Sequence, residues 1–149
     1  MTFISSTMAR ACLNDWDRSL TVNDILDLLL ALKRAVVTAG SRVVLIVAVR
    51  ETVPIPQHFL LTCIQGALPA ILDCCERLVL VVEGAGIERL AFRTAFQVSR
   101  ATAARRQRAP IVIFESLSAA FAHAQRFAPH DVLELQRHVL HQFLSPNGQ

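Results

Sequence analysis

The sequence predicts an α/β fold built on one mixed, mostly parallel sheet. Three apolar, β-branched runs are typical of strands covered on both faces, namely RVVLIVAV (42–49), RLVLVVEG (77–84) and PIVIFES (110–116). Helical patterns separate them, and strands that alternate with helices join a parallel sheet through right-handed crossovers. A chain of 149 residues with 53% hydrophobic content is long enough for one domain with a filled core.

Five helices are expected between and after these strands. The first covers about 23–39, because Thr21 and Asp24 form a capping box before it and Gly40 can end it. The other four are expected at 57–75, 87–105, 117–127 and 130–144. We expect Pro69 to kink or split the second helix, since proline cannot donate a main-chain hydrogen bond.

Both ends of the chain add elements to this plan. Residues 1–13 are expected to hold one or two short strands, with FIS and ARACL as candidates, and NDWDRS (14–19) is expected to form a turn. The sheet then has four or five strands with helices packed on it. We divide the chain into an α/β domain, 1–128, and an extra C-terminal amphipathic helix with a short tail, 129–149. That helix docks on its own domain or binds a second copy.

Several classes of protein do not fit the composition. The most apolar window without charge, 52–72, contains three prolines, so we predict no membrane span. The N-terminal residues lack a basic stretch followed by an apolar one, so we expect no signal peptide and a cytoplasmic location. The four cysteines form no CxxC pair and no histidine stands near them at metal-ligand spacing. We therefore predict reduced cysteines, no metal and no cofactor.

The turns after the strands are the candidate sites, because open parallel sheets bind ligands at the carboxyl ends of their strands. Glu51, Glu83 and Glu115 all fall there, either as a carboxylate cluster or as solvated acids near helix N-termini. The glycines at 84–86 are not a GxGxxG motif, and the sequence has no GxSxG, P-loop or nucleophile–base set. The sequence therefore does not predict an enzyme.

One stretch of the chain is strongly basic. Six of the 15 Lys and Arg residues lie there, namely Arg89, Arg93, Arg100, Arg105, Arg106 and Arg108. The first three share a helical face, so the stretch is either an anion-binding patch or a solvated surface. We do not expect nucleic acid as a partner, because the net charge is only +3.

The order of elements resembles the STAS domain, the fold of anti-sigma-factor antagonists, and is similar to SEC14-like lipid-binding domains. Four stretches look like those of a group of small STAS-like proteins from myxobacteria. They are Trp16 followed by LTVNDI, RVVLIVAV followed by VPIPQ, LVLVVEGAGI, and IVIFESLSAAFAHA. The resemblance covers about residues 10–125 and leaves the C-terminal helix outside.

This resemblance implies a regulatory module, not an enzyme, that binds a protein partner or a second copy of itself. In the antagonists, the turn after the central strand carries an Asp-Ser-(Ser/Ala/Thr)-Gly motif whose serine a partner kinase phosphorylates. The turn here has no serine, and Thr52 is its only hydroxyl and the candidate phosphoacceptor. We expect the partner surface at Arg50, Glu51, Thr52, Val53 and Pro54. The alternative is a small apolar ligand or lipid binding protein of SEC14-like type.

Overall fold

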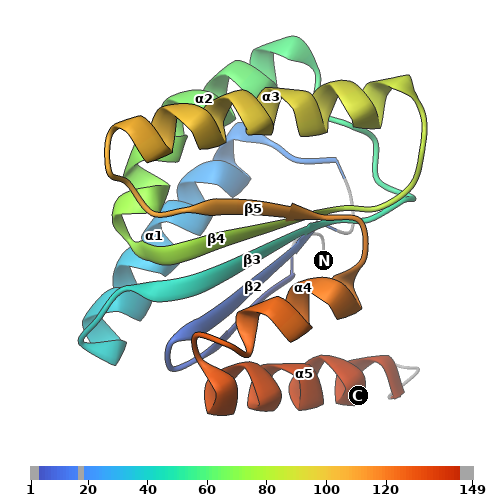
Figure 1. The fold of residues 1–149 in the computed structure, drawn as a ribbon. Helices are drawn as coiled ribbons and strands as arrows, with labels where there is room; N and C mark the ends of the chain where they lie inside the picture. The colour runs from blue at the N-terminus through green and yellow to red at the C-terminus, as the bar shows by residue number, and fades with distance from the viewer. Residues whose placement is uncertain (1–3, 17–18, 145–149) are drawn as a thin grey trace.

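The computed structural model describes residues 4–16 and 19–144. The strands in this part of the chain are β1 (Ile4–Met8), β2 (Ala11–Trp16), β3 (Val43–Val49), β4 (Cys75–Val82) and β5 (Ile111–Phe114). The helices are α1 (Val22–Ala39), α2 (His58–Asp73), α3 (Ile87–Arg105), α4 (Leu117–Ala124) and α5 (Pro129–Leu144). Figure 1 shows their arrangement.

The strands form one sheet in the order β1-β2-β3-β4-β5. β1 pairs antiparallel with β2, and every other neighbouring pair is parallel. The predicted fold class, a mostly parallel α/β sheet with an additional C-terminal helix, is confirmed. The register sets Trp16 beside Val49 and Val49 beside Val82, so the carboxyl ends of β2, β3 and β4 meet at one edge.

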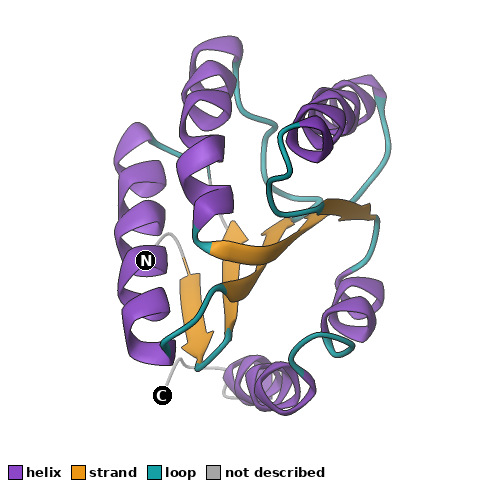
Figure 2. Ribbon diagram, turned by 60° about the vertical axis from the view of Figure 1, so that its left-hand side comes forward, coloured by secondary structure: helices purple, strands orange, loops and turns teal. Residues whose placement is uncertain are grey.

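The helices form two layers, one on each face of the sheet (Figures 1 and 2). Helices α1, α2 and α3 cover one face, because each right-handed crossover moves one strand further in the same direction. Helices α4 and α5 follow the last strand and cover the other face. The carboxyl edge is therefore surrounded by the first turns of α1, α2 and α3.

The core under α1, α2 and α3 is closely filled. Trp16 packs edge-on against Phe92 at a ring-centroid distance of 6.4 Å, and Phe92 lies 5.0 Å from Phe96. All three rings are at most 4% exposed. The enclosed apolar space among Trp16, Phe96 and their neighbours has a volume of about 40 Å³, close to that of one water molecule.

The other core depends on α5. Val132 and Leu135 are fully buried and Val139 is 7% exposed. They pack with Leu13, Ile46 and other sheet residues, and the helix lies along β1 and β2. Of the two alternatives for the C-terminal helix, the structure shows docking on its own domain.

One sequence-based expectation was wrong, and of the two alternatives for Pro69, a kinked or a split helix, the split is excluded. Asn14, Asp15 and Trp16 are the last residues of β2 and not a turn, because their main chain continues the ladder with β3. Pro69 does not split α2, which continues from His58 to Asp73. Because proline has no amide hydrogen, the carbonyl of Gln65 loses the hydrogen bond that residue 69 would donate. Both residues are exposed on the solvent side of the helix, where water can donate to this carbonyl instead.

His123 of α4 lies between two aromatic rings at the border of this second core. Its ring centroid is 5.3 Å from that of Phe114 and 5.3 Å from that of Phe127. The guanidinium carbon of Arg77 stands 4.0 Å above the Phe127 ring. Burial, with smaller contributions from Arg77 and Arg126, lowers the pKa of His123 from its ordinary value of 6.5.

Because the unfolded chain binds a proton at His123 more readily than the folded one, stability is expected to fall as the pH drops below 6.5. The loss levels off below the lowered pKa of the folded state. The His123→Gln variant should lose less thermal stability than the wild-type chain between about pH 7.5 and pH 5. Equal losses in the two chains would show that His123 takes up its proton as easily in the folded state.

Candidate functional site

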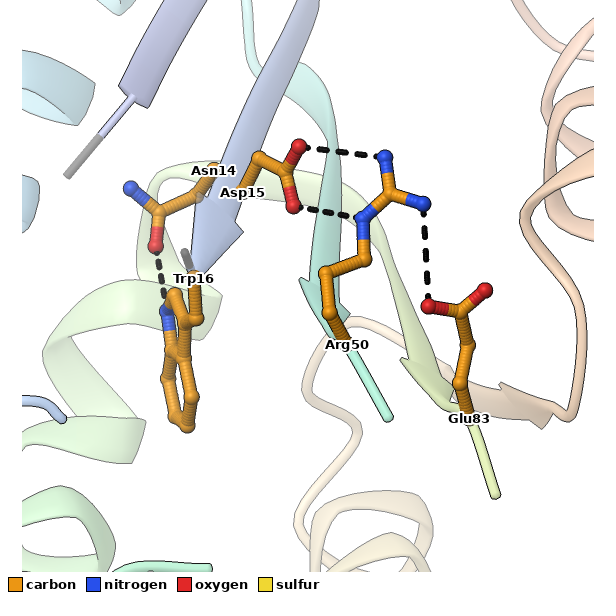
Figure 3. A network of polar contacts seen from close by, with 5 residues as sticks. All are labelled: Asn14, Asp15, Trp16, Arg50 and Glu83. Carbon is orange, nitrogen blue, oxygen red and sulfur yellow. Dashed lines mark hydrogen bonds and ion pairs between the residues drawn. The ribbon is translucent and has the colours of Figure 1, made fainter. Parts of the chain in front are cut away.

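Three charged side chains meet at the carboxyl edge of the sheet (Figure 3). Asp15 is the penultimate residue of β2, Arg50 follows β3 and Glu83 follows β4. Side chains alternate along a strand, and these three positions fall on the face covered by α4 and α5. Because β2, β3 and β4 end in register, the three residues lie side by side although far apart in sequence.

Arg50 joins the two carboxylates. Its Nε and Nη2 donate to the two carboxylate oxygens of Asp15 at 2.8 and 3.1 Å, and its Nη1 lies 3.6 Å from Oε1 of Glu83. The Asp15 side chain is 9% exposed and the Arg50 side chain 22%. The hydrogen bonding of Arg50 to the Asp15 carboxylate, ahead of the other charge interactions, raises the pKa of Arg50. The bidentate pair holds two strand ends together and occupies the carboxylate oxygens of Asp15.

On the opposite face of β2, the Trp16 indole is fixed by a neighbour. Its Nε1 donates to Oδ1 of Asn14 at 2.7 Å, and both residues are buried. The bond satisfies the one polar atom of the indole within the core under α1, α2 and α3. Trp16 thereby supports Phe92, which lies at the start of α3 next to the edge.

Two arginines of α3 bind main-chain carbonyls at this edge. Arg89 Nη2 donates to the carbonyls of Glu51 and Val53 at 2.7 and 2.6 Å. Arg93 Nη2 donates to the carbonyls of Val82 and Gly84 at 2.6 and 2.8 Å. These guanidinium groups, candidates for anion contacts, thus hold the turns after β3 and β4.

Gly84 makes this arrangement possible. Its φ of +89° lies in the left-handed region, and a Cβ there would come within 3.1 Å of Glu51 and 3.2 Å of Arg89. The residue therefore permits both the sharp turn after β4 and the close approach of Arg89. The GAG sequence at residues 84–86 therefore forms the turn between β4 and α3.

The rest of the basic stretch lies elsewhere. Helix α3 leads away from the carboxyl edge, so Arg105, Arg106 and Arg108 lie at the amino edge, where Arg108 binds Asp73 at 2.9 Å. Arg100 is exposed on the helix between the two groups. The structure therefore places five of the six arginines in two separate groups, with Arg100 between them, and does not bring them together.

The three glutamates of the edge differ in their surroundings. Glu83 is paired with Arg50, while Glu115 is 83% exposed and 4.0 Å from Arg93. Glu51 is exposed beside Gly84. In the part of the chain that the structure describes, no three His, Cys, Asp or Glu side chains group as they would to hold a metal ion.

Burial raises the pKa of the Cys74 and Cys75 thiols, which favours their neutral form.

In the turn after β3, Val53 is buried and its neighbours are exposed. Val53 is 2% exposed and its amide donates to the Arg50 carbonyl at 3.1 Å. Thr52 and Pro54 on either side are exposed. Helix α2 begins only at His58, so Thr52 does not stand at a helix N-terminus.

The segment Pro54–Gln57, which we call the ridge, separates two hollows in the surface. The smaller, of about 270 Å³, is lined by the ridge with Ser19, Leu20, Phe59 and Leu60. The larger, of about 540 Å³, is lined by the ridge with His58, Leu61, Glu88, Ala91 and Phe92. Most of these side chains are apolar, and Phe59 is 71% exposed. Chemically, the arrangement offers apolar contact area and few free polar groups.

Sequence reasoning identified the turn but missed Asp15 and the two hollows. Asp15 was assigned to a turn, and its pairing with Arg50, 35 residues away, depends on the register of β2 and β3. The sequence pattern that could have indicated this grouping is that Asp15, Arg50 and Glu83 each stand near the end of an apolar run.

No helix in residues 4–16 and 19–144 is both long and apolar enough to cross a membrane. Comparison of the chain with protein-family models, curated proteins and solved structures gives no match.

Proposed function

We propose that the chain is a non-enzymatic, regulatory protein–protein interaction module of STAS-like type, and that the ridge and its two hollows bind the partner. The observation that carries the proposal is the pair of apolar hollows beside a partly exposed ridge. Binding energy in protein interfaces is concentrated in a few apolar or aromatic side chains that fill pockets. A partner segment that crosses the ridge would place one such side chain in each hollow.

The charged groups around the ridge favour binding over catalysis. Asp15 and Arg50 bind each other, and Arg89 and Arg93 bind carbonyls. A general acid or base needs a titratable group within reach of a substrate and with a suitable pKa. Here the same groups bind one another or the main chain of the turns after β3 and β4, and Arg89 holds the turn that leads into the ridge, which favours a preformed binding surface.

The core supports a protein partner more than a carrier of an apolar ligand or lipid. The enclosed space under α1, α2 and α3 is about 40 Å³. Ligand pockets for small molecules have volumes of about 300 to 1,000 Å³. The larger spaces beside the ridge are open hollows of the surface, which suits a partner's side chains.

Thr52 is the candidate site of regulation within this proposal. It is exposed two residues before Pro54, the first residue of the ridge. A phosphate there would add about −1.5 to −2 charges next to the apolar hollows. Phosphorylation is therefore expected to weaken an apolar partner contact.

Capture of the partner from the native host by a tagged chain tests the proposal. Phe59→Asp places a charge beside the smaller hollow, and Ala91→Trp fills the larger one. Each variant is expected to reduce the captured partner at least about tenfold, while the chain stays folded because both positions are exposed.

Leu140→Asp is the matched control, because Leu140 is 61% exposed on α5, away from the ridge. It should leave capture unchanged. A partner that binds Phe59→Asp and Ala91→Trp as well as the wild-type chain would contradict the proposed surface.

A further inference from the structure

Helix α1 carries an apolar stripe on the side that faces away from its own core. Val22, Leu26, Leu30 and Val37 are 41%, 54%, 52% and 82% exposed. The core-facing side of the same helix already holds Ile25, Leu28, Leu32 and Ala35. A helix on a soluble domain is ordinarily apolar on one side only, so the second stripe requires its own explanation.

The four exposed residues lie along one side of the helix, with Lys33 between Leu30 and Val37. At 3.6 residues per turn they fall within an arc of about 80°, and from Val22 to Val37 the stripe is about 22 Å long. Helix α1 lies at the outer side of its layer, and no described element covers the stripe (Figure 2).

Charged residues lie on one flank of the stripe and, at Lys33, within it. Asp27 lies in its first half, and Lys33 and Arg34 lie in its second half. All three are exposed, and none forms an ion pair with another described residue. The stripe is thus acidic near one end and basic near the other.

We propose that α1 binds the α1 of a second copy of this chain, antiparallel across a twofold axis near Leu30. In that arrangement Leu30 meets its own copy, and Asp27 of each chain faces Arg34 of the other. Asp27 and Arg34 lie on the same flank of the stripe, about 4.5 and 6 Å from Leu30 in opposite directions along the helix, so the twofold axis brings them close together. A parallel pair would set like charges opposite each other.

This inference is separate from the proposed function. No residue of the stripe lines either hollow beside the ridge. The variants Phe59→Asp and Ala91→Trp, which are designed to weaken partner binding, should therefore leave self-association intact. A failure of the dimer and a failure of the proposed function can thus be told apart. A pair of single helices buries little surface, so we expect a dissociation constant in the micromolar range.

Sedimentation equilibrium of the full chain at concentrations up to about 100 µM tests the inference. The wild-type chain should form a dimer, and Leu30→Glu should raise the dissociation constant at least about tenfold. Leu90→Glu is the matched control, since Leu90 is 59% exposed on the outer helix at the other side of the layer. It should leave the dissociation constant unchanged.

Charge exchange tests the orientation. Asp27→Lys alone and Arg34→Glu alone should each weaken the dimer, because like charges then face each other across the axis. Both changes together should restore it. A chain that stays monomeric at about 100 µM, a dimer equally weakened by Leu90→Glu, or a double variant weaker than either single variant would overturn the inference.

Discussion

Replacement of Asp15 by alanine is expected to lower the free energy of unfolding by about 3 kcal/mol. The change leaves the Arg50 guanidinium without its bidentate partner at a position where its side chain is only 22% exposed. Glu83, 3.6 Å from Arg50, compensates in part. Urea unfolding of the two chains, followed by circular dichroism, measures the loss.

Glu134→Ala is the matched control for this variant. Its carboxylate also binds an arginine, Arg137, at 2.8 Å, but both side chains are well exposed on α5. The free energy of unfolding should change there by less than about 0.5 kcal/mol. If Asp15→Ala costs no more than Glu134→Ala, Asp15 does not hold the strand ends together and is free for another role.

Removal of residues 129–149 is expected to abolish cooperative unfolding. Val132 and Leu135 are fully buried on the sheet, so the truncation exposes the core that they share with Leu13 and Ile46. The shortened chain should bind a hydrophobic dye and tend to aggregate. Thermal unfolding with dye fluorescence measures both properties.

Single substitutions separate the role of the buried side of α5 from the loss of the helix itself. Leu135→Ala should lower the free energy of unfolding by about 3 kcal/mol, whereas Leu133→Ala, at a position 40% exposed, should lower it by less than about 1 kcal/mol. If residues 1–128 unfold cooperatively at the wild-type midpoint, α5 is an appendage and not part of the core.

The fold was predictable because its signals are local. The β-branched runs mark β3, β4 and β5, and the capping box at Thr21 marks the start of α1, with Asp24 Oδ2 2.8 Å from the Thr21 amide. The end of β2 was not predictable in this way, since Asn14 and Asp15 are polar residues that favour turns. They are held in the strand by contacts with Trp16 and Arg50.

The candidate site was predictable only in position. The rule that ligands bind at the carboxyl ends of parallel strands pointed to the turn after β3. The periodicity of α3 placed Arg89 and Arg93 on one face, but not their reach to the carbonyls of Val53 and Val82. Hydrogen bonds of that kind, and the hollows beside the ridge, depend on how α3 is set against the turn.

Site-specific photo-cross-linking in the native host tests the central claim, partner binding at the ridge, most directly. A photoreactive amino acid at Gln57, exposed on the ridge, is compared with one at Arg137, exposed on α5. We predict a covalent adduct of a single partner from position 57 and none from position 137. An adduct with that partner only from position 137 would contradict the claim.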